Sequence, residues 1–197
     1  MGILLITLDT NEVDPGTVAS LRRAIGDFPH QISVVTVTQR ERGHGAVMEA
    51  LAEITPVRET AVWGESRWDE AVWGFGDGGS VPEGFVVGES RVGDAQLVGA
   101  GVPDLESILR IITNGSFPKV GSRETLTDTQ RRQLRDAMIL QAHSREKRHV
   151  LISEDKAFGP TTRDRLEALC STKLRNRAEF IELAQQRRLA ELLPESM

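Results

Sequence analysis

The chain has 197 residues, of which 39% are hydrophobic and 27% are charged, and its formal net charge is -5. This length fits one large domain rather than two full ones, and the composition excludes collagen-like, low-complexity and wholly disordered chains. The single cysteine, Cys170, excludes an internal disulfide and a multi-cysteine zinc site.

Charge is unevenly distributed along the chain. Residues 1–100 contain 7 Lys and Arg against 15 Asp and Glu, whereas residues 101–197 contain 17 against 14. An acidic chain is not a general nucleic-acid coat, but a basic surface beside an acidic site attracts a phosphate backbone. The apolar run of residues 3–8 has no basic region before it and is too short for a signal peptide or a membrane span, so we expect a cytoplasmic protein without a membrane anchor.

The first quarter of the chain alternates between strand and helix patterns. Residues 3–8 form a short, nearly continuous apolar run, which is typical of a strand inside a parallel sheet. A helix is predicted from Pro15, with Asp14 as its N-cap. Residues 32–37 predict a second strand, and residues 46–54 predict a second helix.

The last third of the chain repeats this alternation. Thr127 and Gln130 form a capping box that begins a helix running to about Lys147, and residues 150–153 predict the next strand. Three further elements are a helix from Thr161, a short strand over residues 171–174 and a helix from Asn176. Strands that alternate with helices predict a three-layer α/β/α domain with a mostly parallel central sheet.

Residues 62–102 interrupt this alternation, and we interpret them as an insertion within a single domain of residues 1–197. This part is rich in glycine and contains all three tryptophans, which are Trp63, Trp68 and Trp73. It also contains an internal repeat, because GESR at residues 64–67 recurs at residues 88–91. Two copies are too few for a solenoid and predict two similar turn-and-strand elements. The tryptophans fit a small satellite core or a homodimer interface, and stacking on unpaired bases is the alternative.

Carboxylates follow several of the predicted strands. Asp9 comes directly after the first strand, Glu41 lies just past the second, and Asp155 follows the strand at residues 150–153. Asp136 lies in the preceding helix, beside the apolar residues of its inner face. Because ligands of open parallel sheets bind at the carboxyl ends of the strands, we expect these four acids to meet at one edge. Converging carboxylates repel one another unless a cation neutralises them, which predicts a Mg²⁺ or Mn²⁺ site suited to phosphodiester hydrolysis.

Three segments of the chain resemble the signature segments of PIN-domain ribonucleases. They are Asp9-Thr10-Asn11, residues 136–143 with the sequence DAMILQAH, and residues 150–158 with the sequence VLISEDKAF. The resemblance covers roughly residues 3–55 and 104–183 and implies a PIN-like fold. It also implies that the four acids named above bind Mg²⁺ or Mn²⁺, and that water attacks an RNA phosphodiester to leave a 5′-phosphate and a 3′-hydroxyl.

Further residues are expected to support these acids. Asn11 would orient Asp9 through its amide, and Ser153 would hydrogen-bond a carboxylate or a metal-bound water. A basic surface beside the acidic site is expected to guide the RNA. The residues that we assign to this surface are Arg131, Arg135 and Lys156.

The sequence therefore predicts a hydrolase, namely a metal-dependent endoribonuclease that cleaves single-stranded RNA. One alternative is a DNA-directed nuclease with the same site, since the sequence assigns no residue to recognition of the 2′-hydroxyl that distinguishes RNA from DNA. Another is a non-catalytic protein-interaction module that uses the Trp-rich insertion, with the acids in structural roles and Glu41 paired with Arg40 or Arg42. The compact toxins of the PIN family are shorter than this chain, and a toxin role would bring an inhibitory antitoxin protein as a partner.

Overall fold

Four parallel strands form the central sheet of the protein. The computed structural model describes residues 2–35, 37–38, 57, 59–60, 86–87, 90–91, 95–96, 103–119, 123 and 125–194. The strands are β1 (Leu4–Leu8), β2 (His30–Val34), β7 (Val150–Ile152) and β8 (Lys173–Arg175). They lie in the order β2-β1-β7-β8, and every neighbouring pair is parallel. Directly after β2, Val35 forms an isolated parallel bridge with Val57.

Five α-helices lie in the described part of the chain. They are α1 (Pro15–Ile25), α4 (Leu105–Ile112), α5 (Asp128–Arg145), α6 (Pro160–Cys170) and α7 (Arg177–Gln185). Three 3-10 turns accompany them, which are η1 (Thr10–Glu12), η3 (Lys156–Phe158) and η4 (Leu189–Leu192). None of the described helices combines the length and the apolar character needed to cross a bilayer.

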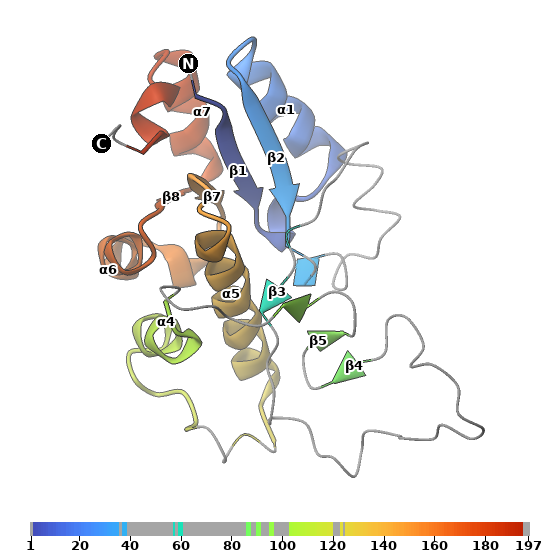
Figure 1. Cartoon of the computed structure of the whole chain (residues 1–197), viewed down its shortest axis with the longest axis vertical. Coiled ribbons are helices and arrows are strands. Elements are labelled where there is room, and N and C mark those ends of the chain that lie inside the picture. Colours follow the sequence, from blue (N-terminus) through green and yellow to red (C-terminus); the bar gives the residue numbers. More distant parts are fainter. Residues whose placement is uncertain are drawn as a thin grey trace, which may run out of the picture.

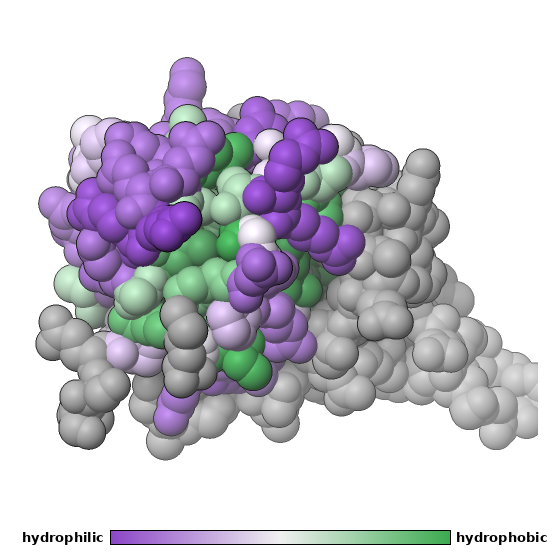
Figure 2. All heavy atoms as spheres, turned by 90° about the horizontal axis from the view of Figure 1, so that it is seen from above, coloured by the Kyte–Doolittle hydropathy of each residue, from purple (hydrophilic) through white to green (hydrophobic). Residues whose placement is uncertain are grey.

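The helices cover both faces of the sheet. One apolar cluster joins β1, β2 and β7 to α1, α7 and η4, with Phe180 and Leu21 fully buried in it. A second cluster joins the other face to α4, α5 and α6, with Met138 and Leu151 fully buried. Figure 1 shows α5 running beside the sheet and extending past the ends of β1 and β2. Viewed end-on, apolar residues lie between groups of polar ones (Figure 2). The fold is α/β with helices on both faces of a parallel sheet, as expected.

Several helix boundaries agree with the sequence predictions because local capping chemistry determines them. α1 begins at Pro15 with the Asp14 side chain accepting from Thr17 N, and it ends before Gly26, whose φ is 58°. The capping boxes of Thr127 and Asn176 are both present, at the starts of α5 and α7. These ends depend on residues within one turn, so the sequence alone predicts them.

Other boundaries differ from the predictions. α6 begins at Pro160 with Gly159 as its N-cap and without a side-chain capping bond, because proline is already shaped for the first helical position. β2 ends at Val34 instead of continuing to residue 37, where the chain turns and Thr38 N donates to the Val35 carbonyl at 2.9 Å. The predicted helix at residues 46–54 lies outside the described residues.

Helix α4 was not predicted, although the sequence carries its signals. Asp104 accepts from Ser107 N as the N-cap, and the apolar residues follow at helical spacing. Two of them, Ile108 and Leu109, are buried against the α5 side of the core. The helix was missed because it directly follows the glycine-rich segment that was interpreted as an insertion.

The interpretation of residues 62–102 as an insertion stays a prediction, because only three short strands within this range, β4, β5 and β6, are described. β3 (Glu59–Thr60) pairs in parallel with β6 (Ala95–Gln96), and β4 (Val86–Val87) pairs antiparallel with β5 (Ser90–Arg91). The second copy of the repeat thus contains β5 and β6. The first copy and the three tryptophans lie outside the described residues.

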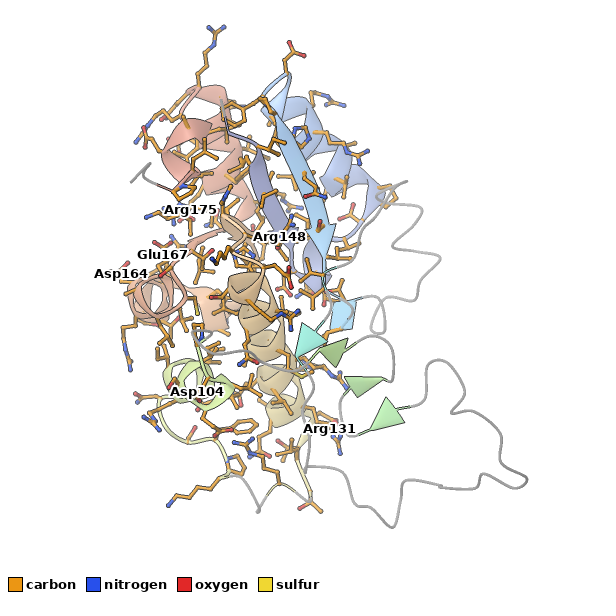
Figure 3. The ribbon with its side chains drawn as sticks, viewed as in Figure 1. Asp104, Arg131, Arg148, Asp164, Glu167 and Arg175 are labelled. Atoms are coloured by element: carbon orange, nitrogen blue, oxygen red, sulfur yellow. The ribbon has the colours of Figure 1, made fainter. Side chains whose placement is uncertain are left out.

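A buried polar network holds the sheet to α5. The Arg148 side chain donates from Nε to Thr7 Oγ1 at 2.8 Å and from Nη2 to the Ile6 and Gln31 carbonyls at 2.6 and 3.1 Å. Figure 3 shows this arginine among the strands. Burial lowers the pKa of Arg148 to about 10, so the group stays charged at neutral pH. The buried guanidinium of Arg148, which precedes β7, therefore joins β1 to β2.

His143 continues this network from α5. Its Nδ1 lies 2.8 Å from Thr7 Oγ1, and its Nε2 makes a very short contact with Thr172 Oγ1. Arg148 can only donate to Thr7, so the consistent arrangement has the Thr7 hydroxyl donating to Nδ1 and the neutral ring donating from Nε2. Burial lowers the pKa of His143 to about 3, and the charges of Arg148 and His149 act in the same direction. The ring is a structural link and is neutral at physiological pH.

Replacing Arg148 with alanine is expected to lower the free energy of unfolding by about 3 kcal/mol. The Ile6 and Gln31 carbonyls would lose a charged donor, and each such hydrogen bond contributes about 1.5–3 kcal/mol. Urea denaturation at pH 7 measures the change. Arg23→Ala on the exposed face of α1 is the control, with an expected change below about 0.5 kcal/mol. A loss for Arg148→Ala no larger than that of the control would contradict this role.

Acid is expected to destabilise the protein between pH 6.5 and about 3 through His143. The folded pKa lies below the ordinary value of 6.5, so the unfolded chain takes up a proton in this range and the folded chain does not. The maximum slope for one such group is about 1.4 kcal/mol per pH unit. Thermal unfolding of His143→Gln across this range should show a shallower slope than the parent. An unchanged slope would show that His143 does not titrate this way. His149, whose pKa burial also lowers, would then remain as a contributor.

Candidate functional site

Asp9 lies at the point where the strand order of the sheet reverses. It follows β1 directly, and its backbone N–H donates to the Ile152 carbonyl of β7 at 3.0 Å. β1 connects through α1 to β2 on one side, whereas β7 connects through α6 to β8 on the other side. Such a switch point leaves a crevice at the carboxyl ends of the strands, which is the usual ligand site of open α/β sheets.

The Asp9 carboxylate is buried and held in a fixed orientation. Only 2% of the residue is exposed. Its Oδ1 accepts from Thr10 N at 2.7 Å, as the N-cap of η1, and its Oδ2 accepts from Ser153 Oγ at 2.5 Å. Ser153 follows β7 and is also buried. The hydroxyl thus joins the loop after β1 to the loop after β7.

Asp155 lies in that same loop after β7. Its backbone N–H donates to Ser153 Oγ at 3.0 Å, and its Oδ1 accepts from Ala157 N at 2.7 Å, which caps η3. Asp9 and Asp155 are therefore linked through a single serine hydroxyl. In each of them one carboxylate oxygen caps a short 3-10 turn. Capping is a structural role, which is the alternative that the sequence analysis gave for these acids.

Asp136 is a half-buried residue on the side of α5 that faces the sheet. It precedes His143 by seven residues, which is close to two helical turns, so both side chains lie on one face of the helix. His143 contacts Thr7 in β1. Asp136 lies about 10 Å further along the helix, in the direction of the carboxyl ends of the strands. This position is on the same edge as Asp9, which lies two residues beyond Thr7.

Glu41 lies outside the described residues, as do its neighbours Arg40 and Arg42. The chain just before it is described at Thr38, which is buried. Thr38 Oγ1 lies 3.2 Å from Thr10 Oγ1, in the loop after Asp9. Thr38 therefore lies next to the Asp9 loop.

The remaining predicted residues lie at different places around this edge. Asn11 is exposed within η1, next to the Asp9 loop, and Lys156 is exposed directly after Asp155. Arg131 lies in the first turns of α5, at the end remote from the sheet (Figure 3). Arg135 is half-buried one turn further along the same helix. Two of these basic residues thus lie on α5, and the third lies in the loop after β7.

Sequence reasoning missed Glu12, the most buried charge of this edge besides Asp9. It ends η1, with 2% of the residue exposed, and its Oε2 has no hydrogen-bond donor in the described structure. Arg177 Nη1 lies 3.7 Å from this oxygen. Burial raises the pKa of Glu12, Arg177 opposes the rise, and the nearby carboxylates add to it. These carboxylates are Glu154, Asp9 and Asp14. The sequence did contain a signal for Glu12, because it lies three residues after Asp9 at the end of a strand and is followed by the apolar Val13.

The polar side chains at this edge carry oxygen donors. The groups that gather here are carboxylate and hydroxyl oxygens, which Mg²⁺ and Mn²⁺ prefer, and the buried Glu12 oxygen lacks a hydrogen bond. Within the described residues, no group of three or more His, Cys, Asp or Glu side chains has an arrangement that could hold a metal ion. The predicted ligand set also includes Glu41, which lies outside those residues.

Comparisons with known proteins do not assign the chain to a family. No protein-family model matches the sequence, and neither a curated protein nor a solved structure is significantly similar to it.

Replacing Glu12 with glutamine is expected to stabilise the protein above about pH 4.5. The pKa of Glu12 is higher in the folded chain than in the unfolded chain, so the unfolded chain gives up this proton more easily. Ionisation of Glu12 therefore lowers the free energy of unfolding above its ordinary pKa of 4.5, and has no effect well below that pH. Urea denaturation in EDTA at pH 7.5 and at pH 4 measures the difference. Glu182→Gln on an exposed part of α7 is the control and should show no gain. A loss of stability at pH 7.5 with Glu12→Gln would contradict this reasoning.

Proposed function

We propose that the chain is a metal-dependent ribonuclease with a PIN-like arrangement, acting on single-stranded RNA. The observation that carries the proposal is the contact between the loops after β1 and β7, where Asp9 and Asp155 are joined through Ser153 at the switch point of the sheet. The parallel sheet with helices on both faces is the coarse architecture that this proposal requires.

Burial of Asp9 is the second support. A carboxylate with 2% exposure is rare in a protein interior unless a partner compensates for its lost hydration. The Ser153 hydroxyl and the Thr10 backbone N–H donate to the Asp9 carboxylate. Its nearest acidic neighbours add negative charge, because Asp9 and Glu12 raise the electrostatic cost of one another. A divalent cation would offset this repulsion.

The residues that would hold Mg²⁺ or Mn²⁺ are Asp9, Glu41, Asp136 and Asp155. When bound, such an ion lowers the pKa of a coordinated water and stabilises charge on the phosphate oxygens. The chain's own contribution is to orient the ligands. Ser153 fixes Asp9 through Oδ2 and receives the Asp155 backbone N–H, so both acids keep their positions as substrate enters.

The basic residues would bring RNA to this edge. Their positive charge would come from Arg131 and Arg135 on α5, the helix that also carries Asp136, and from Lys156 directly after Asp155. Phosphate contacts of this kind give affinity and orientation without base specificity. The same site would accept single-stranded DNA, and the preference between the two is one outcome of the test below.

Asp136→Asn and Asp9→Asn are each expected to lower the cleavage rate of a single-stranded RNA oligonucleotide in Mn²⁺ by at least about a hundredfold. Each variant removes a charge from the ligand set, while the side-chain volume stays the same. Cleavage is followed on a denaturing gel, with a matched DNA oligonucleotide in parallel. Asp27→Asn, an exposed acid beyond the end of α1, is the control and should retain full activity.

Thermal unfolding of the same variants separates chemistry from folding, and both should melt close to the parent. Full activity of Asp136→Asn and Asp9→Asn would disprove the proposed site. Titration of the parent with Mn²⁺ by calorimetry gives an independent result. Absence of binding at millimolar Mn²⁺ would favour the interaction module, with Asp9 and Asp155 serving only as caps.

A further inference from the structure

Arg177 lies where the loops after three neighbouring strands meet. It is the first residue of α7, just after β8, whose Arg175 carbonyl accepts from Ser153 N at 3.1 Å. Its own backbone N–H donates to Glu154 Oε1 at 3.0 Å, in the loop after β7. Its guanidinium reaches the loop after β1, where Nη1 lies 3.7 Å from Glu12 Oε2. Arg177 thus borders the same edge as Asp9 and Asp155.

The guanidinium of Arg177 is held on one side and open on the other. Nη1 donates to Thr17 Oγ1 at 2.7 Å, which is its one hydrogen bond within the described structure. A guanidinium has five N–H donors in a planar fork. Its side chain is 43% exposed, whereas the Glu12 side chain behind it is 3% exposed. Most donors therefore remain available to a ligand on the solvent side.

Other arginines nearby are engaged differently. A pocket of about 240 Å³ between α6 and α7 is lined by three of them, which are Arg163, Arg175 and Arg188. Each donates to a carboxylate at hydrogen-bond distance, with N–O distances of 2.8, 2.5 and 2.7 Å to Glu179, Glu167 and Glu191 respectively. Figure 3 shows the Arg175 and Glu167 side chains close together beside α6. Each of these three arginines thus has a carboxylate at hydrogen-bond distance, whereas Arg177 Nη1 lies 3.7 Å from Glu12 Oε2.

The Glu12 contact does not complete a closed ion pair. At 3.7 Å it is longer than a hydrogen bond, and Glu12 Oε2 receives no donor. A pair formed for stability alone would be expected to satisfy the buried carboxylate with direct N–H bonds. The buried anion instead attracts the guanidinium to the edge of the site, while Thr17 determines its orientation.

We propose that Arg177 binds the two non-bridging oxygens of an RNA phosphate that neighbours the scissile one, and that Glu12 holds its guanidinium in place. This inference rests on the proposed ribonuclease function and assigns a substrate contact to it. Two parallel N–H donors match two phosphate oxygens, which lysine cannot reproduce. Arg177 is then a substrate-binding residue, and Glu12 is a positioning residue.

The test compares Arg177→Gln and Arg177→Lys with the parent, using a fluorescein-labelled single-stranded RNA. Binding is measured by anisotropy in EDTA over a series of salt concentrations, and cleavage is measured in Mn²⁺. Arg177→Gln should raise Kd and KM about tenfold, leave kcat within about threefold, and reduce the slope of log K against log salt by about 0.7. Arg177→Lys should retain the parental slope with an intermediate Kd.

Arg188→Gln is the matched control, because it removes the same charge from the far end of α7, where Arg188 pairs with Glu191. It should change Kd and KM by less than twofold. Glu12→Gln should raise KM with little effect on kcat, since it removes the anion that holds Arg177. Melting curves confirm that the variants compared are folded.

The outcomes separate this inference from the proposed function. A parent that cleaves RNA, with Arg177→Gln matching it in KM, Kd and salt slope, would overturn the role of Arg177 and leave the ribonuclease intact. Equal losses in Arg177→Gln and Arg188→Gln would also overturn it, because the effect would then be one of net charge. A parent that neither binds nor cleaves RNA would overturn both proposals.

Discussion

The buried charge of Arg148 is the constraint on which the rest of the structure depends. It donates to backbone carbonyls of β1 and β2 and to Thr7, which in turn contacts His143 of α5. A cation without these acceptors would be too costly to bury, so the strands and the helix have to meet in one arrangement. That arrangement determines where α5 crosses the sheet. It therefore also determines on which edge Asp136 lies, two turns away on the same helical face.

At the carboxyl edge of the sheet the buried charges are negative, whereas that of Arg148 is positive. Here negative charges gather around Asp9 and Glu12, both almost fully buried, and nearby carboxylates raise the pKa of Glu12 further. Such a cluster opposes stability, whereas the Arg148 network supports it. An unfavourable cluster of this kind is more often found at functional sites than in a packed core, which is in keeping with the function proposed above. Arg177 fits this interpretation, because it compensates Glu12 only partly and keeps an exposed face.

Local chemistry made much of the fold predictable. Capping residues such as Asp14, Thr127 and Asn176 act within a single turn, and they mark helix starts that the structure confirms. The positions of Asp9 and Asp155 after strands were likewise visible, because strand ends follow from apolar runs. Glu12 and Arg177 were not found, since neither belongs to a motif. Their significance comes from a contact between residues 165 positions apart, which a linear pattern does not contain.

The sequence by itself determined the alternation of strands and helices, the absence of a disulfide and the identity of the acids at the strand ends. Each of these depends on residue type and on spacing over a few positions. Only the tertiary structure decided that the strands lie in the order β2-β1-β7-β8 and that Ser153 reaches Asp9. It also decided that Arg177, after β8, contacts Glu154 in the loop after β7 and Glu12 after β1. These features depend on which strands become neighbours, and long-range packing of buried side chains selects that arrangement.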